Sequence, residues 1–140
     1  MKWTLVGKEE LWGAKKLALC GDKARALKKY EHVLKTFPEI GDQALFGMAV
    51  LYAESGTGKG DYKKSLDVFQ VILERYPRSD LKEETRVMIA LINELLASRK
   101  QAESWEKEAE TLKQQIEQMK EIDRDVERKR RRLKPLKRGS

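Results

Sequence analysis

Apolar residues recur every three to four positions through most of this chain, a spacing typical of amphipathic helices. Glycine, proline and capping aspartates interrupt the pattern and divide it into five predicted helices. The helices are expected from about Lys8 to Cys20, from Asp22 to Pro38, from Asp42 to the glycine-rich stretch Ser55–Gly60, from Asp61 to Pro77, and from Ser79 or Asp80 to Pro135. Residues 1–7 lack periodicity. The pattern therefore predicts an all-α protein.

Two stretches that lie 39 residues apart share one spaced pattern. The first copy consists of Gly21, Asp22, Ala26, Tyr30, Val33 and Pro38, and the second of Gly60, Asp61, Ser65, Phe69, Ile72 and Pro77. Each copy places a Gly-Asp turn before a helix, a small residue five positions after the glycine, an aromatic four further on, and a closing proline. Recurrence at this period is typical of stacked helical hairpins. We therefore expect two hairpins, with the start of the last helix covering their open end.

The last predicted helix changes character along its length. Beyond its wide apolar start, apolar residues fit a seven-residue repeat. The seam of this repeat consists of Ala102, Trp105, Ala109, Leu112, Ile116, Met119 and Val126, continuing to Leu133, with Asp123 and Arg130 as polar members. Unbroken from Ser79 to Arg132, the helix would reach roughly 80 Å at about 1.5 Å per residue. Because such a helix buries little by itself, the seam predicts a coiled-coil partner, either a second copy or another protein. Trp105 is expected either to pack in that coil or to anchor a different partner.

Charge is distributed unevenly along the 140 residues, of which 40% are hydrophobic and 38% charged. Residues 1–123 hold 21 basic and 21 acidic side chains, whereas residues 124–140 hold nine basic and two acidic ones. This length and composition suit one modest domain with a charged extension. We predict a helical repeat domain over residues 1–98, a coiled-coil extension over 99–133 and a disordered basic tail over 134–140.

The basic residues near the end of the chain form the strongest charge cluster. Its members are Arg128, Lys129, Arg130, Arg131, Arg132 and Lys134. Such a cluster is typical of contact with an anionic membrane surface or an acidic partner, or of a solvated helix end. Nonspecific binding of nucleic acid is the alternative function. No aromatic side chain lies among these bases to stack on nucleotides, which disfavours nucleic acid as the partner.

Enzymatic chemistry finds little support in the residue types present. Nucleophilic and metal sites need several convergent groups, and the chain has one cysteine and one histidine. Cys20 is expected to be a small buried thiol and His32 a solvated surface residue. We therefore predict a protein without catalytic, metal or cofactor sites that acts through protein contacts.

The hairpin pattern resembles the tetratricopeptide repeat, a helical protein-interaction module, over residues 8–98. The small, aromatic and proline positions match in the second helix of each hairpin, and Ala14, Leu17, Ala49 and Tyr52 occupy packing positions of the first helices. The resemblance implies an inner groove for a protein ligand. Lys15, Phe46, Val50 and Ala53 are expected to face it. Alternatively, Phe46 and Val50 pack in the core against the last helix.

The order of motifs is also similar to that of QseG-like bacterial lipoproteins. The motifs are Gly41-Asp42-Gln43-Ala44-Leu45-Phe46, Asp61-Tyr62-Lys63-Lys64-Ser65-Leu66, Tyr76-Pro77-Arg78-Ser79 and Lys120-Glu121-Ile122-Asp123. The resemblance implies a scaffold at the periplasmic face of the outer membrane that acts on a sensor kinase. That location requires an export signal upstream of residue 1, because this sequence shows neither a signal nor a lipidated cysteine. Otherwise, the chain is expected to be a general adaptor in envelope assembly or in the cytoplasm.

Overall fold

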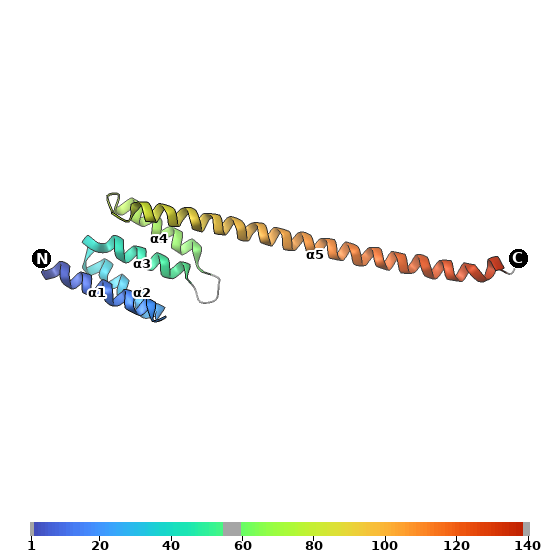
Figure 1. Cartoon of the computed structure of the whole chain (residues 1–140), viewed down its shortest axis with the longest axis horizontal. Helices are drawn as coiled ribbons and strands as arrows, with labels where there is room; N and C mark the ends of the chain where they lie inside the picture. Colours follow the sequence, from blue (N-terminus) through green and yellow to red (C-terminus); the bar gives the residue numbers. More distant parts are fainter. Residues whose placement is uncertain (1, 55–59, 139–140) are drawn as a thin grey trace. The chain divides into compact units, whose positions relative to one another are not determined.

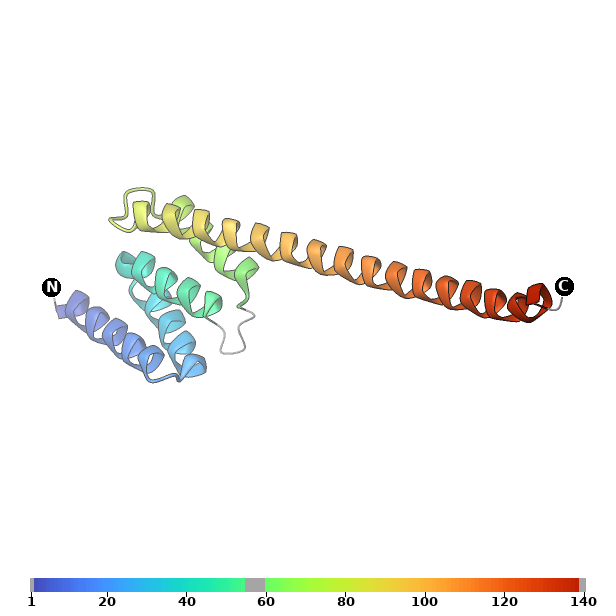
Figure 2. The ribbon, with the colours of Figure 1, turned by 45° about the vertical axis from the view of Figure 1, so that its right-hand side comes forward.

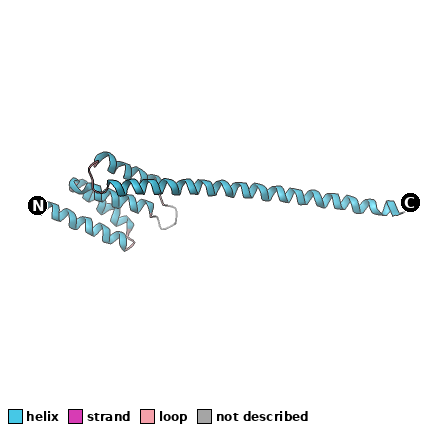
Figure 3. Cartoon of the chain, turned by 45° about the horizontal axis from the view of Figure 1, so that its top comes forward, coloured by secondary structure: helices cyan, strands magenta, loops and turns pink. Residues whose placement is uncertain are grey.

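The computed structural model describes residues 2–54 and 60–138, and these residues are almost entirely helical (Figures 1 and 3). The elements are α1 (Lys2–Leu19), α2 (Lys23–Thr36), the 3₁₀ turn η1 (Pro38–Ile40), α3 (Gly41–Ala53), α4 (Tyr62–Arg75) and α5 (Lys82–Arg138). No strand occurs among the described residues. The predicted all-α class and the long last helix are confirmed.

The chain divides into two compact units, residues 1–96 and 97–140. This division falls two residues before the predicted boundary. In the first unit α1 packs on α2, α2 on α3, and α3 on α4 (Figures 1 and 2). The helices α1 and α2 form one hairpin and α3 and α4 the other, as the repeated pattern predicts.

The start of each second helix is fixed by the Gly-Asp pair. The Asp22 carboxylate accepts a hydrogen bond from the backbone N–H of Arg25 at 3.3 Å, and the Asp61 carboxylate accepts one from Lys64 at 3.1 Å. These bonds satisfy N–H groups that have no partner within the helix. Gly21 has φ +86°, a backbone conformation that glycine tolerates best. Both predicted caps are confirmed.

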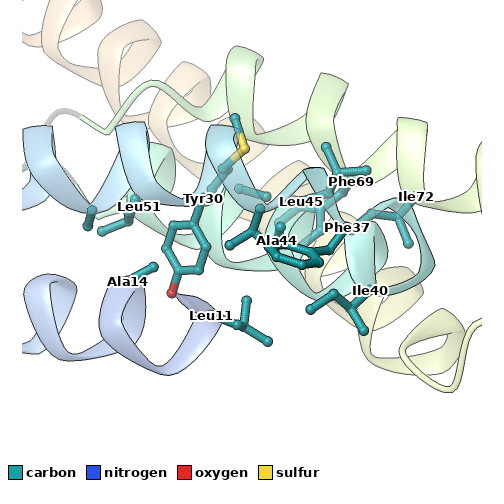
Figure 4. Close-up of a cluster of buried hydrophobic side chains, with 14 of the residues drawn as sticks. Leu11, Ala14, Tyr30, Phe37, Ile40, Ala44, Leu45, Leu51, Phe69 and Ile72 are labelled. Carbon is teal, nitrogen blue, oxygen red and sulfur yellow. The ribbon is translucent and has the colours of Figure 1, made fainter. Parts of the chain in front are cut away.

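The repeated positions form the core of the first unit. Ala26, Tyr30 and Val33 on α2 are buried, and so are their counterparts Ser65, Phe69 and Ile72 on α4. Small side chains let the paired helices approach closely, and the Ser65 hydroxyl donates a 2.7 Å hydrogen bond to the carbonyl of Ala49 on α3. Figure 4 shows the buried cluster that these helices share.

The first turns of α5 complete this core. Thr85 and Ile92 are buried, and Met88 and Ile89 pack against the same cluster. The spacing of these four residues places them on one helical face. The start of α5 therefore belongs to the repeat unit.

The first helix begins at Lys2, not at Lys8 as the periodicity predicts. The ring of Trp3 packs on Phe37, with 4.8 Å between ring centroids. Gly7 is buried, and a Cβ atom there would lie 2.9 Å from the Phe37 ring. Contacts with a residue 34 positions away from Trp3 therefore order a segment whose own pattern is weak.

The last helix also differs from its predicted bounds. It begins at Lys82 and continues through Pro135 to Arg138, so that it includes residues assigned from the sequence to a disordered tail. Proline keeps a φ angle compatible with a helix and removes one backbone donor. A single such loss near the end of a helix does not require the helix to stop at that residue. Residues 139–140 lie outside the described residues.

Thr85→Val is expected to raise the free energy of unfolding by about 1 kcal/mol. The Thr85 side chain is fully buried, and its hydroxyl lacks a hydrogen-bond partner among the described residues. Valine keeps the branched shape and removes the unpaired group. Urea denaturation measures the change, with Ser65→Ala as the matched control. Because the Ser65 hydroxyl is paired, the control should lose stability, and a loss in Thr85→Val would contradict the prediction.

Candidate protein-binding groove

A cavity of about 410 Å³ lies in the first unit where α1, α3 and the turn before α5 meet. We call it the groove. Its lining residues are Lys15, Asp42, Gln43, Phe46, Gly47, Asp80 and Leu81. The groove is therefore built from the first helix of each hairpin and from the segment that follows the second.

Helix α3 provides the floor of the groove. Gln43 and Phe46 lie one turn apart and are both half-buried. The Phe46 ring meets the buried Phe69 ring edge-on, with 5.3 Å between centroids and 71° between ring planes. Such contacts restrict the ring. Phe46 thus lines the groove and also packs in the core against Phe69 of α4.

Gly47 lets α2 approach the floor from behind. A Cβ atom at this position would lie 2.4 Å from Cζ of the Tyr30 ring. Tyr30 is buried, and its side chain reaches from α2 towards α1 in Figure 4. The absence of a side chain at Gly47 therefore lets the Tyr30 ring pack directly against α3.

Two hydrogen bonds fix the segment between α4 and α5, which carries Asp80 and Leu81 of the groove. The Ser79 hydroxyl donates to the Asp42 carboxylate, and the Tyr76 hydroxyl donates to the Pro38 carbonyl at 2.9 Å. Burial raises the pKa of Tyr76 above its ordinary value, and the charge of Asp42 adds to the effect. A phenol already keeps its proton at neutral pH, and the raised pKa extends the range of pH over which Tyr76 donates. The Ser79 oxygen also accepts from the Leu81 N–H at 3.1 Å, which orders the turn that carries Asp80 and Leu81.

The charges around the groove have opposite signs on its two sides. Lys15 on α1 is exposed and places an ammonium group at one rim. Asp80 is exposed in the turn before α5, whereas Asp42 already accepts from Ser79. Phe46 and Leu81 supply apolar surface. The arrangement suits a ligand with an apolar side chain, an acidic group towards Lys15 and a basic group towards Asp80.

Two of the four residues that the sequence predicts to face a ligand groove line this cavity. Lys15 and Phe46 line it, whereas Val50 and Ala53 lie further along α3, half-buried and outside the lining. Val50 packs against the core cluster. The resemblance did not single out Gln43, Gly47, Asp80 or Leu81. Gln43 could have been found from its position one turn before Phe46, but the turn residues are placed by the tertiary hydrogen bonds.

A second hollow, of about 680 Å³, lies on the α1–α2 hairpin and is mostly basic. It is lined by Glu10, Gly13, Lys16, Leu17, Arg25, Lys28, Lys29 and His32. Lys29 pairs with Glu10 at 3.8 Å. His32 is exposed, as predicted. This hollow shares no lining residue with the groove and provides a control surface for experiments.

In the second unit, the side chains of residues 97–133 are exposed, apart from the half-buried Arg99. The exposed set includes every predicted seam residue and the basic residues Arg128–Arg132. Arg128 pairs with Asp125 and Arg131 with Glu127, each at 3.6 Å. The side chain of Lys134 lies outside the described residues. The coiled-coil partner and the anionic contact remain predictions.

Cys20 is exposed, which corrects the expected burial of its thiol. It follows the last residue of α1, where the chain turns at Gly21, so it does not continue the buried face. No group of acidic, histidine or cysteine side chains in the described part of the chain could hold a metal ion. Within the same ranges, no helix has the length and apolar character needed to cross a bilayer.

Residues 43–79 match the family model of the tetratricopeptide repeat. This range covers most of α3 and all of α4, together with the Pro77 turn. Neither the curated proteins nor the solved structures gave a match. Residues 43–79 are therefore similar to a tetratricopeptide repeat, and repeats of this kind generally mediate protein–protein binding.

Proposed function

We propose that this repeat-containing chain is a non-enzymatic scaffold that binds a segment of a partner protein in the groove. The main support for this proposal is the cavity of about 410 Å³, in which Lys15 and Asp80 flank apolar surface from Phe46 and Leu81. A peptide can fill such a site with one side chain and orient itself through charges at both ends.

The fixed geometry of the lining supports this proposal. Contact with Phe69 restrains the Phe46 ring, and the Ser79 hydroxyl ties the turn to Asp42. A ligand that enters would meet side chains whose positions are already set, which lowers the ordering cost of binding. The partner segment should therefore carry an acidic, an apolar and a basic residue in succession.

Photocrosslinking in the source cells tests the groove directly. A benzophenone side chain placed at Gln43 is expected to capture a discrete partner, whereas one at His32 on the other hollow should not. Lys15→Glu should lower capture at Gln43 roughly tenfold, because like charges would then face the acidic end of the ligand. Mass spectrometry of the adducts identifies the captured segment.

Lys16→Glu is the matched control for this charge reversal. Lys16 is the neighbouring exposed residue on α1 and lines the other hollow instead of the groove. It should leave capture at Gln43 nearly unchanged. Equal loss in both variants, or equal capture from Gln43 and His32, would contradict a groove-bound ligand.

The sensing part of a bacterial sensor kinase is our proposed partner in a narrower form of this function. Its support is the order of the four motifs shared with QseG-like lipoproteins, together with the repeat match over residues 43–79. This form places the protein at the periplasmic side of the envelope after removal of an export signal. Adducts with a sensor-kinase domain in the same crosslinking experiment would support it, and adducts only with unrelated proteins would contradict it.

A further inference from the structure

The second unit carries an apolar stripe that no described residue of that unit covers. Trp105, Leu112, Ile116, Met119 and Val126 each expose more than half of their surface. They are spaced by three, four or seven residues, which places them on one side of the helix. Stripes of this kind are covered by a partner helix in coiled coils. The orientation of that partner can be argued from charge.

Charge is segregated along the same stretch of helix. Seven acidic and three basic side chains lie over residues 101–123, whereas six basic and two acidic side chains lie over residues 124–133. All of these side chains are exposed. Two copies aligned in parallel would place each block against the same block of the other copy. Two antiparallel copies can place the basic block of each against the first half of the acidic block of the other.

The seam itself contains two charged residues that also favour the antiparallel orientation. Asp123 and Arg130 occupy seam positions between apolar members. In a parallel pair in register, each would face its own counterpart across the interface, and like charges at such positions repel. In an antiparallel pair, Asp123 and Arg130 no longer face their own counterparts. The small residues Ala102 and Ala109 can then lie opposite the larger side chains of the distal half.

We propose that residues 97–133 of two copies of this chain associate as an antiparallel coiled coil, centred near residue 118. The centre follows from overlaying the most acidic stretch, residues 103–110, on the basic residues 124–133 of the other copy. The proposal goes beyond the groove, because it assigns a second surface and commits it to self-association. Binding of a different protein along this seam is the alternative that the experiment must separate.

Distances between spin labels on the full chain distinguish the two orientations. Single cysteines are introduced at Ser104, Gln118 and Arg132 after Cys20→Ser removes the exposed native thiol. The three positions are 14 residues apart, share one helical face opposite the seam and are exposed. In the antiparallel pair, labels at Gln118 should be closest, and those at Ser104 and Arg132 should be further apart by roughly 40 Å along the axis. A parallel pair would give one similar distance at all three positions.

Sedimentation equilibrium of the full chain tests whether the pair forms through the seam. Dimerisation is expected over micromolar to hundreds of micromolar concentrations and should weaken at high ionic strength, because exposed charges are then screened. Ile116→Asp should weaken dimerisation at least tenfold, since it places a charge in the seam. Gln114→Asp adds the same charge outside the seam and should change it little.

Three results would overturn the proposal. These are a monomer at every concentration, equal label distances at the three positions, and equal effects of Ile116→Asp and Gln114→Asp. A monomer that still crosslinks a partner through Gln43 would leave the groove proposal intact. A dimer whose groove captures nothing would support the coiled-coil proposal and contradict the groove proposal. Each proposal can therefore fail without the other.

Discussion

Phe69→Ala is expected to lower the free energy of unfolding of the repeat unit by about 3–5 kcal/mol. The Phe69 side chain is 0% exposed, and its ring holds Phe46 at the floor of the groove. Its removal costs the transfer free energy of the ring and leaves a cavity between α3 and α4. Because small domains are stable by only about 5–15 kcal/mol, this one change should remove much of the total.

Urea denaturation followed by tryptophan fluorescence measures this loss in a Trp105→Phe background. Trp3 and Trp12 then report only on the first unit, so the signal does not combine two transitions. Leu19→Ala is the control because Leu19 is 85% exposed, and it should change stability by less than about 0.5 kcal/mol. Similar values for the two variants would mean that Phe69 is not a core residue.

Gly47→Ala and Gly13→Ala are expected to change stability in opposite directions. Both glycines lie inside helices, where alanine is favoured by about 1 kcal/mol. At Gly13 the new methyl group would meet the end of the Lys29 side chain, 2.7 Å from Nζ, and that flexible chain can move away. At Gly47 it would meet the buried Tyr30 ring at 2.4 Å. Overpacking of this kind costs about 1–3 kcal/mol, or more where the neighbour cannot shift.

The measurement for this pair is the difference in unfolding free energy under the same conditions as for Phe69→Ala. We expect Gly13→Ala to gain up to about 1 kcal/mol and Gly47→Ala to lose about 1–2 kcal/mol. The double variant Gly47→Ala with Tyr30→Leu should show a smaller penalty for the alanine, because the obstructing ring is gone. If Gly47→Ala were as stabilising as Gly13→Ala, Tyr30 would not pack against α3 as described.

The elements that the sequence predicts well depend on local signals. Asp22 and Asp61 accept from N–H groups three residues later, and both helix starts follow from that short spacing. The beginning of α1 depends instead on the contact of Trp3 with Phe37, which no local pattern contains. Cysteine is usually buried, but Cys20 is exposed because it follows the last residue of α1 at the Gly21 turn. Long-range packing thus decided the points that the sequence left open.

In the groove, too, residues placed by local helical spacing could be predicted, whereas residues placed by tertiary contacts could not. Lys15 and Phe46 could be identified from their helical positions within the repeat. Asp80 and Leu81 reach the cavity because Ser79 binds Asp42, a residue 37 positions earlier. The helical spacing is a local signal, but the turn that closes the site depends on the long-range bond between Ser79 and Asp42.

The aromatic residue before each closing proline packs on a glycine in the first helix of its own hairpin. Phe37 lies over Gly7, and Tyr76, its counterpart 39 residues later, lies over Gly41. In each case a Cβ atom on the glycine would come within 3 Å of the aromatic side chain. A third hairpin engineered onto this unit would therefore need the same glycine–aromatic pair to bring its own two helices equally close, whatever residues occupied its remaining surface.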